Sequence, residues 1–224
     1  FEKQDVRSVM GALIYLVKTK LPEYIGTSPF EIQVLTPMRK GELGVEHLNE
    51  VLQYYLNPAS ESKKEKEGRT GVFREGDKVM QVKNNYKLEW KITNEKGFSV
   101  EEGLGVFNGD MGVIKQINTY SERITVVFDE NREVEYPYSN LDELELAYAI
   151  TIHKSQGSEY PAVVLPLLSG PPILCNRNLL YTAITRAQKC AAIVGRQSMV
   201  EQMIHNETEQ KRYSGLNECL KDGI

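Results

Sequence analysis

Apolar residues recur every three or four positions in the first part of the chain. Between residues 5 and 17 they stand at Val6, Val9, Met10, Leu13, Leu16 and Val17, which is typical of one face of a helix. A second pattern of this kind runs from 45 to 55. Between the two, "EIQVLTP" (31–37) predicts a short buried strand that Pro37 ends. The chain is therefore expected to begin as helix, strand, helix.

The pattern changes after residue 56. Residues 57–71 are almost without apolar side chains and carry alternating charges, so they are expected to be a mobile linker. From 72 to 144, short β-forming stretches are divided by Gly, Asn and Asp, and "FNGDMG" (107–112) predicts a tight turn. Residues 93–105 are expected to form an exposed hairpin or loop. Together these short strands predict a small all-β barrel.

Helices and strands alternate again in the last third. Strands are predicted for "LELAYAI" (144–150), 162–167 and 190–195, and helices for 178–188 and 197–206. Such alternation predicts a parallel sheet that is covered on both faces. We therefore predict an α/β domain made of residues 1–71 and 145–224, interrupted by an inserted β-barrel of residues 72–144.

Composition narrows the function classes. The net charge of −4 does not mark the whole chain as a nucleic-acid binder, so any DNA contact would need a local patch. Cys175, Cys190 and Cys219 are widely spaced, which favours reduced thiols, and the three histidines show no zinc-ligand spacing, so no metal site is predicted. Neither a signal peptide nor a membrane span is evident, so we expect a cytoplasmic protein without membrane contact. The absence of an initial Met suggests a fragment.

Polar side chains are concentrated in "TIHKSQGSEY" (151–160), directly after a predicted strand. Thr151, Ser155 and Ser158 offer hydroxyl groups, and the point charge of Lys154 suits a phosphate. Glu159 could accept a hydrogen bond from a sugar hydroxyl or from metal-bound water. Ligands of open parallel sheets bind at the carboxyl ends of strands. An ordinary loop, in which Thr151 caps a turn and Lys154 is solvated, explains the pattern equally well.

Two further clusters accompany the same elements. One face of the predicted helix 178–188 is apolar, and the other carries Tyr181, Thr182, Thr185 and Arg186. Arg186 is either solvated or placed to stabilise charge on a transferring phosphoryl group. "TPMRKG" (36–41) puts Arg39 and Lys40 after a strand, either as loop surface or as a second phosphate-facing pair. We expect all three clusters to converge on one edge of the sheet.

The residues in these clusters resemble a known family. "TIHKSQGSEY" resembles motif V of superfamily-1 helicases, "LLYTAITRAQ" (179–188) resembles motif VI, and "QVLTPMRKGELGVEHLN" (33–49) resembles the motif IV region. "GDKVMQVKNNY" and "FNGDMGVI" resemble the inserted SH3-like barrel of RecD-like DNA helicases, also called exodeoxyribonuclease V alpha subunits. The resemblance covers roughly residues 30 to 205 and implies a second RecA-like motor domain with an inserted SH3-like barrel.

The resemblance also implies roles for single residues. Arg186 would reach the γ-phosphate of ATP as an arginine finger, and Arg39 would approach the nucleotide phosphates. Gly157 and Glu159 would lie near the ribose and the interdomain cleft. The residues implied to face single-stranded DNA are Thr151, His153 and Lys154. Lys78, Lys83 and Asn84 would guide the strand along the barrel, or the lysines would only protect its edge from aggregation.

The chain has no G-x-x-x-x-G-K-[ST] sequence and no Asp-Glu pair after an apolar strand. The resemblance implies that these elements, and most contacts to ATP and Mg²⁺, belong to an upstream RecA-like P-loop domain, which the helix at 5–17 would join to this one. The whole protein would be an ATP-dependent 5′-to-3′ DNA helicase, whereas the chain alone would not hydrolyse ATP. Its expected partners are single-stranded DNA, the upstream domain and proteins of recombination or repair.

Two other functions compete with this interpretation. The chain could be a non-catalytic DNA- or protein-binding module of a DNA-repair complex, which the acidic net charge slightly favours. A metal-dependent nuclease would need carboxylates clustered around Mg²⁺. The acidic residues of 129–145 are instead spread along predicted strands and turns, which argues against a nuclease.

Overall fold

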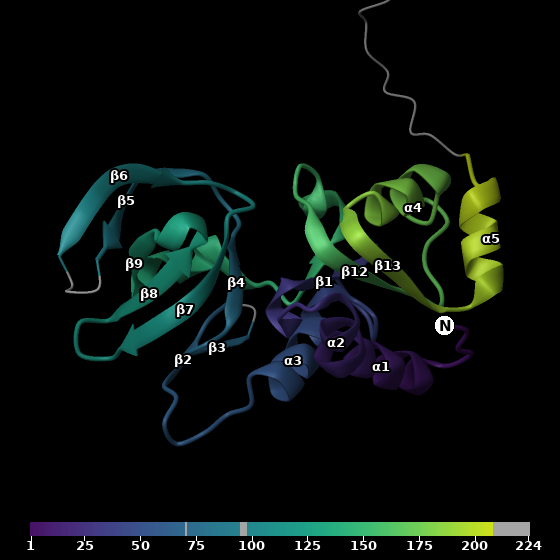
Figure 1. Ribbon diagram of the computed structural model, residues 1–224, viewed down its shortest axis with the longest axis horizontal. Helices are drawn as coiled ribbons and strands as arrows, with labels where there is room; N and C mark the ends of the chain where they lie inside the picture. The colour runs from purple at the N-terminus through teal and green to yellow at the C-terminus, as the bar shows by residue number, and fades with distance from the viewer. Residues whose placement is uncertain (70, 95–97, 208–224) are drawn as a thin grey trace, which may run out of the picture.

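The computed structural model describes residues 1–69, 71–94 and 98–207, and Figure 1 shows two sheets side by side. The parallel sheet has the order β11-β1-β12-β13 and the antiparallel sheet the order β10-β4-β7-β8-β9-β5-β6. The helices are α1 (Val6–Tyr15), α2 (Leu21–Ile25), α3 (Val45–Leu56), α4 (Arg177–Ile184) and α5 (Gln197–His205). The parallel strands are β1 (Ile32–Thr36), β11 (Ala149–Thr151), β12 (Tyr160–Leu167) and β13 (Ala187–Gly195). The chain is thus a mixed α/β structure.

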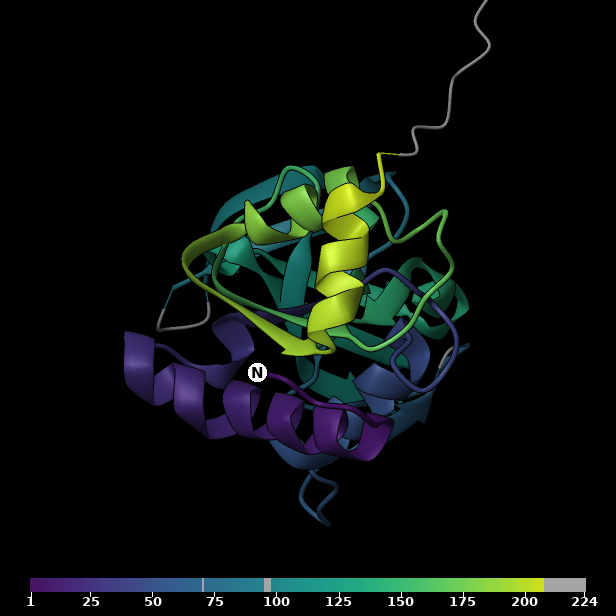
Figure 2. The same ribbon diagram turned by 90° about the vertical axis from the view of Figure 1, so that its right-hand side faces the viewer.

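Helices cover both faces of the parallel sheet, as predicted (Figures 1 and 2). Alternate residues of β1 point to opposite faces because a strand has a period of two. Val34 packs with α1 and α3, whereas Leu35 packs in a separate cluster with α4 and α5. The first of these cores continues into the antiparallel sheet, so both sheets share buried surface.

Two predicted helices differ in length from the structure. The helix predicted at 5–17 continues through a π-helical turn (Leu16–Lys20) into α2, and Gly26 ends it with a φ of +67°. The helix predicted at 178–188 ends at Ile184, because the chain turns at Thr185 and pairs Ala187 with Tyr160 of β12. Arg186 therefore lies in a turn before a strand and not on a helix face. None of the described helices could span a membrane.

The antiparallel sheet contains β4 (Lys78–Gln81), β5 (Asn85–Thr93), β6 (Ser99–Val106), β7 (Met111–Asn118), β8 (Arg123–Phe128), β9 (Glu133–Pro137) and β10 (Leu144–Leu146). The predicted SH3-like barrel is not confirmed, because β10 and β6 remain unpaired edges within the described residues. The exposed hairpin (β5 and β6) and the turn at 107–112 are confirmed, and Gly109 adopts a φ of +104° in that turn. Residues 95–97 lie outside the described residues.

The predicted mobile linker contains regular structure. Its strand β2 (Glu65–Glu67) pairs with β3 (Val72–Arg74). The Arg74 guanidinium donates to the Glu65 carboxylate (Nε–Oε1 2.6 Å) and to the carbonyl of Asn57 (Nη1–O 2.5 Å). Glu65, which lies in the predicted linker, is therefore paired with Arg74 of the following strand across a hairpin.

The strand predicted for "LELAYAI" is divided between the two sheets. β10 pairs antiparallel with β4, and β11 pairs parallel with β1, so the chain changes sheet at Ala147 and Tyr148. The Asn49 side chain of α3 stabilises this crossing. Its amide donates to the carbonyls of Leu146 (3.0 Å) and Ala149 (2.9 Å), and its oxygen accepts from the Ala149 N–H (2.8 Å).

Asp77, a buried residue before β4, also connects the two parts. Its carboxylate accepts from the Gln53 amide (2.6 Å), the Asn57 amide (2.7 Å), the Tyr148 hydroxyl (2.9 Å) and the Arg74 N–H (2.6 Å). Burial raises the pKa of Asp77, and these hydrogen bonds oppose that rise. One carboxylate therefore joins α3, the β2–β3 hairpin and the crossing at Tyr148.

We expect Asp77→Ala to lower the free energy of unfolding by about 3 kcal/mol or more, because it leaves several buried donors without an acceptor. Urea unfolding followed by circular dichroism measures this change. The matched control is Asp142→Ala, which removes an exposed carboxylate paired with Lys83 and should change the free energy of unfolding far less than Asp77→Ala. Equal losses in the two variants would contradict the role of Asp77.

Candidate functional site

The predicted site residues lie on two opposite edges of the parallel sheet. Arg39 follows the end of β1, and the turn that carries His153 and Lys154 follows the end of β11. Glu159 precedes β12 and Arg186 precedes β13, whose first residues pair side by side. Because all four strands are parallel, the first pair lies at the carboxyl edge and the second at the amino edge. The prediction that all clusters converge on one edge is therefore wrong.

At the carboxyl edge, Thr151 is the N-cap of a 3₁₀ turn (Ile152–Ser155), and its hydroxyl accepts from the Lys154 N–H (3.4 Å). The capping role predicted for Thr151 is thus present. Ser155 is buried and donates to the Ile152 carbonyl (2.7 Å), whereas His153 is exposed. The turn therefore buries Ser155 in the fold and leaves His153 exposed to solvent.

Glu145 of β10 binds the cations of this edge, and the sequence analysis did not identify it. Its carboxylate accepts from Arg39 (Nη2–Oε1 3.0 Å) and Lys154 (Nζ–Oε2 3.0 Å), and Arg69 lies 3.8 Å away. Burial favours the neutral acid, yet hydrogen bonds from Arg39 and Lys154 outweigh it and lower the pKa of Glu145. The same carboxylate raises the pKa of Arg39. Glu145 and Arg39 are therefore both charged at neutral pH.

At the amino edge, Arg186 is held by the loop before β12. Its Nη1 donates to the Ser158 carbonyl (3.2 Å), and its own carbonyl accepts from the Tyr160 N–H (2.8 Å). The Nε of Arg186 is buried and makes no hydrogen bond within the described structure. Such an orphaned donor is uncommon and suits an anionic acceptor brought from outside.

Glu159 and Gly157, two other predicted site residues, flank Ser158, whose carbonyl binds Arg186. Glu159 is exposed and accepts from the Gln188 amide of β13 (3.3 Å). Gly157 adopts a φ of +88°, which favours glycine, and no atom lies within 4 Å of the position of its missing Cβ. The loop 157–159 thus turns sharply while leaving space above it.

The three residues predicted to contact DNA from the inserted sheet have different surroundings. Lys78 is buried, and its ammonium group donates to the Phe30 carbonyl (2.7 Å) and to Gln33 Oε1 (2.9 Å), so it binds the α/β part. Lys83 is exposed and pairs with Asp142. Asn84 is also exposed, and its oxygen accepts from the Asn108 N–H (2.8 Å). This geometry favours a structural role for Lys78.

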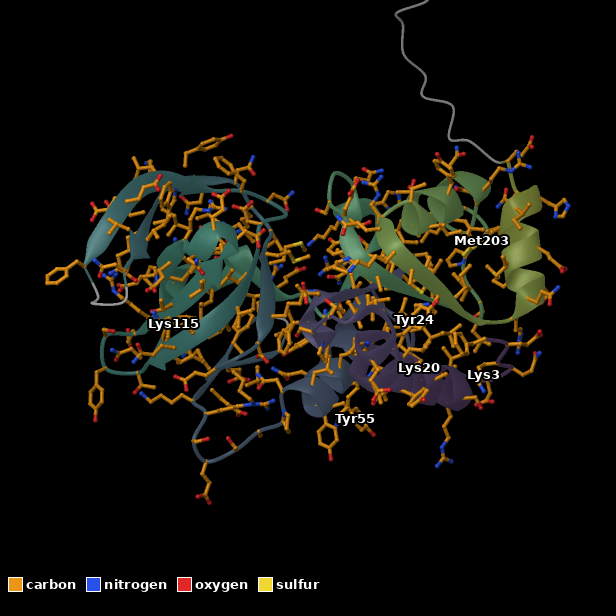
Figure 3. The ribbon with its side chains drawn as sticks, in the orientation of Figure 1. Lys3, Lys20, Tyr24, Tyr55, Lys115 and Met203 are labelled. Atoms are coloured by element: carbon orange, nitrogen blue, oxygen red, sulfur yellow. The ribbon has the colours of Figure 1, made fainter. Side chains whose placement is uncertain are left out.

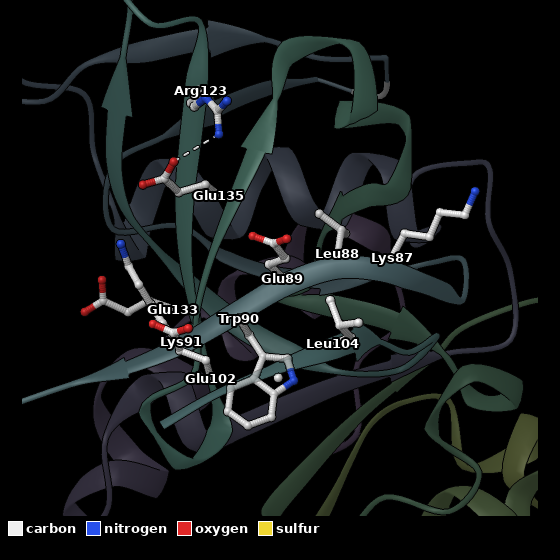
Figure 4. Close-up of a pocket in the computed structure, with 11 residues that line it drawn as sticks. Lys87, Leu88, Glu89, Trp90, Lys91, Glu102, Leu104, Arg123, Glu133 and Glu135 are labelled. Atoms are coloured by element: carbon white, nitrogen blue, oxygen red, sulfur yellow. Dashed lines mark hydrogen bonds and ion pairs between the residues drawn. The ribbon is translucent and has the colours of Figure 1, made fainter. Parts of the chain in front are cut away.

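A groove of about 570 Å³ separates the two sheets near the amino edge. Its walls include Lys78, Asp129 and Glu159. A second groove of about 590 Å³ lies on β5 and β6, and Trp90 lines it (Figure 4). The indole of Trp90 lies against Gly103 of β6. A Cβ at Gly103 would lie 2.3 Å from the indole ring, so only glycine fits there.

No described group of three His, Cys, Asp or Glu residues could hold a metal ion. Cys175 and Cys190 are free thiols, and Cys219 lies outside the described residues.

Two family models match the chain in order. A model of the SH3 domain of ATP-dependent RecD-like DNA helicases matches residues 48–128, and a model of the UvrD-like helicase C-terminal domain matches residues 146–194. The ATP-dependent RecD2 DNA helicase of Deinococcus radiodurans is 40% identical over 160 residues, which are 71% of this chain and 19% of that protein. The predicted resemblance to RecD-like helicases is confirmed.

A second curated relative of this RecD-like chain belongs to the same family. The RecBCD enzyme subunit RecD of Mycolicibacterium smegmatis is 30% identical over 191 residues, which are 85% of this chain and 29% of that protein. The chain therefore spans less than a third of the length of either curated relative. A crystal structure of the Pif1 helicase from Bacteroides with ADP-AlF3 and ssDNA has 17% identity and a TM-score of 0.49, covering 96% of this chain and 54% of that one.

The buried amine of Lys78 generates a pH prediction. Burial lowers its pKa from 10.5 to about 8, although Glu31 and Asp129 oppose the shift. Since the folded pKa lies below the unfolded one, the unfolded state binds more protons between these values, and stability rises with pH there. Between about pH 7.5 and 9.5, we expect the free energy of unfolding of the wild type to rise by about 2 kcal/mol more than that of Lys78→Met. Urea unfolding at each pH measures the difference, and parallel pH profiles would contradict it.

Proposed function

We propose that the chain is the second motor domain, with its inserted sheet, of an ATP-dependent DNA helicase that moves 5′-to-3′ on single-stranded DNA. One observation carries the proposal. The two helicase family models match successive parts of the chain, and the second includes both the His153 turn and Arg186. The chain lacks a P-loop sequence, so ATP hydrolysis would need an upstream RecA-like domain.

The surroundings of Arg186 support a role as an arginine finger. Its guanidinium keeps a buried Nε without an acceptor, and only a backbone carbonyl holds its Nη1. The residues present therefore fit a triphosphate, whose oxygens would supply the missing acceptors. Bound ATP would supply the phosphoryl group that is transferred to water. Glu159 and Gly157 lie on the adjoining loop, where they would border the ribose. The described residues do not fit Mg²⁺, which would be held by the upstream domain.

Hydrolysis would depend on the position of Arg186 relative to the upstream domain. When that domain approaches the amino edge, the guanidinium would bind the γ-phosphate and stabilise the charge that develops during transfer. Departure of the phosphate would remove this acceptor and release the contact. Repeated approach and release would move the DNA-facing carboxyl edge, which carries Thr151, His153 and Lys154, along the strand. Exposed Lys83 and Asn84 are the remaining candidates for DNA contacts on the inserted sheet.

The second candidate function is a DNA- or protein-binding module of a repair complex. The groove beside Trp90 favours it, since this mixed-charge surface belongs to neither edge of the parallel sheet. The two functions differ in their dependence on ATP. A helicase joined to its upstream domain hydrolyses ATP faster when single-stranded DNA is added, whereas a passive module has no effect on ATP turnover.

We expect Arg186→Ala, in the protein that includes the upstream domain, to lower kcat for ATP by about 10³-fold with little change in KM. Arg186→Lys should also be strongly impaired, because an ammonium group lacks the planar fork. Arg123→Ala is the control, since Arg123 is an exposed arginine paired with Glu135 on the antiparallel sheet. DNA-stimulated ATP hydrolysis is the measurement. Turnover at the parent rate in Arg186→Ala would refute the arginine-finger role.

A further inference from the structure

The cations around Glu145 come from three separate segments of the chain. Arg39 follows β1, Lys154 lies in the turn after β11, and Arg69 lies between β2 and β3. All three approach one carboxylate at 3.0, 3.0 and 3.8 Å. Because Glu46 also lies 3.9 Å from Arg39, three positive and two negative charges meet here, which leaves a local excess of one positive charge. A surface salt bridge would need only one cation, so the surplus calls for an explanation.

The exposure of these side chains shows where the surplus charge points. The Glu145 side chain is 10% exposed, whereas those of Lys154, Arg39 and Arg69 are 28%, 44% and 67% exposed. The carboxylate therefore lies beneath the cations, which reach solvent above it. An arginine has five N–H donors, and Arg39 uses one of them in its hydrogen bond to Glu145. Glu46, its other acidic neighbour, is 3.9 Å away.

We propose that Arg39, Arg69 and Lys154 bind a backbone phosphate of single-stranded DNA, and that Glu145 is the internal counter-ion of this site. The inference rests on the proposed function and extends it from Lys154 to Arg39, Arg69 and Glu145, which have no predicted DNA role. It also gives Arg39 a role different from the predicted contact to nucleotide phosphates. Arg39 shares its edge with Thr151 and His153, whereas Arg186 lies at the opposite edge of the sheet.

The counter-ion has a physical consequence for binding. Glu145 holds the three cations together before DNA arrives, so little order is lost when a phosphate binds. It also neutralises part of their charge, which weakens the hold on DNA. A contact that must form and break at every step of movement benefits from both properties.

The test is a titration of fluorescent oligo-dT with the 224-residue chain at about 50 and 200 mM salt. Each phosphate contact contributes about 0.7 to the salt slope of single-strand binding, so fourfold more salt should weaken the wild type about 2.6-fold more than Arg39→Gln or Arg69→Gln. Lys20→Gln is the control, because it removes one positive charge from an exposed residue of the π-helical turn (Figure 3). This variant should keep the salt dependence of the wild type. Thermal unfolding checks that each variant is folded.

Glu145→Gln gives the opposite expected sign. Loss of the internal negative charge should tighten oligo-dT binding about threefold or more and steepen its salt dependence. Glu145→Asp keeps the charge and should bind oligo-dT like the wild type. It is the variant to measure if Glu145→Gln does not fold. A competing titration with ATP distinguishes a DNA phosphate from a nucleotide phosphate as the ligand. If ATP displaces oligo-dT from the wild type but not from Arg39→Gln, the inference is overturned.

The outcomes separate the two proposals. If the wild type binds oligo-dT but the arginine variants keep its affinity and salt slope, the phosphate site is wrong while the helicase proposal stands. If the wild type shows no binding at low salt, the phosphate site is wrong, and DNA-stimulated ATP hydrolysis by the protein that includes the upstream domain decides the helicase proposal separately. Weaker binding by a folded Glu145→Gln chain would also overturn the counter-ion role.

Discussion

The Asp77 carboxylate is the contact on which the arrangement of the two sheets depends. It accepts hydrogen bonds from α3, from the β2–β3 hairpin and from Tyr148, where the chain returns to the parallel sheet. Removal from water makes such a group costly, and only its full set of donors compensates. The antiparallel sheet is consequently attached at a defined position, and β10 brings Glu145 to the end of β11, beside Lys154.

The parallel sheet separates two kinds of chemistry. Its amino edge carries Arg186 with an unused donor, and its carboxyl edge carries the cations on Glu145. The loop between β11 and β12 runs from one edge to the other within eight residues (152–159). In the proposed motor, this segment is the shortest covalent route between the nucleotide side and the DNA side.

Much of the fold could be predicted because apolar spacing reports burial directly. β1, α1 and α3 follow from that spacing, and so does the parallel sheet with helices on both faces. The missed features depend on contacts between distant residues. Pairing with β12 ends α4 early, the register of β10 divides "LELAYAI", and an open sheet has the same local pattern as a barrel. The same holds for the site: the sequence singles out Lys154 and Arg186 as candidates, but their placement on opposite edges and the contact with Glu145 depend on the three-dimensional pairing.

The two-residue crossing at Ala147 and Tyr148 has a mechanical consequence. A hinge needs residues whose backbone angles can change without loss of buried contacts. Here both residues are buried, and Asn49 makes three hydrogen bonds across the crossing. Bending at this point would break those bonds and expose the hydroxyl of Tyr148. The two sheets should therefore turn together as one rigid body, and in the proposed motor the movement would arise at the contact with the upstream domain and not between the sheets.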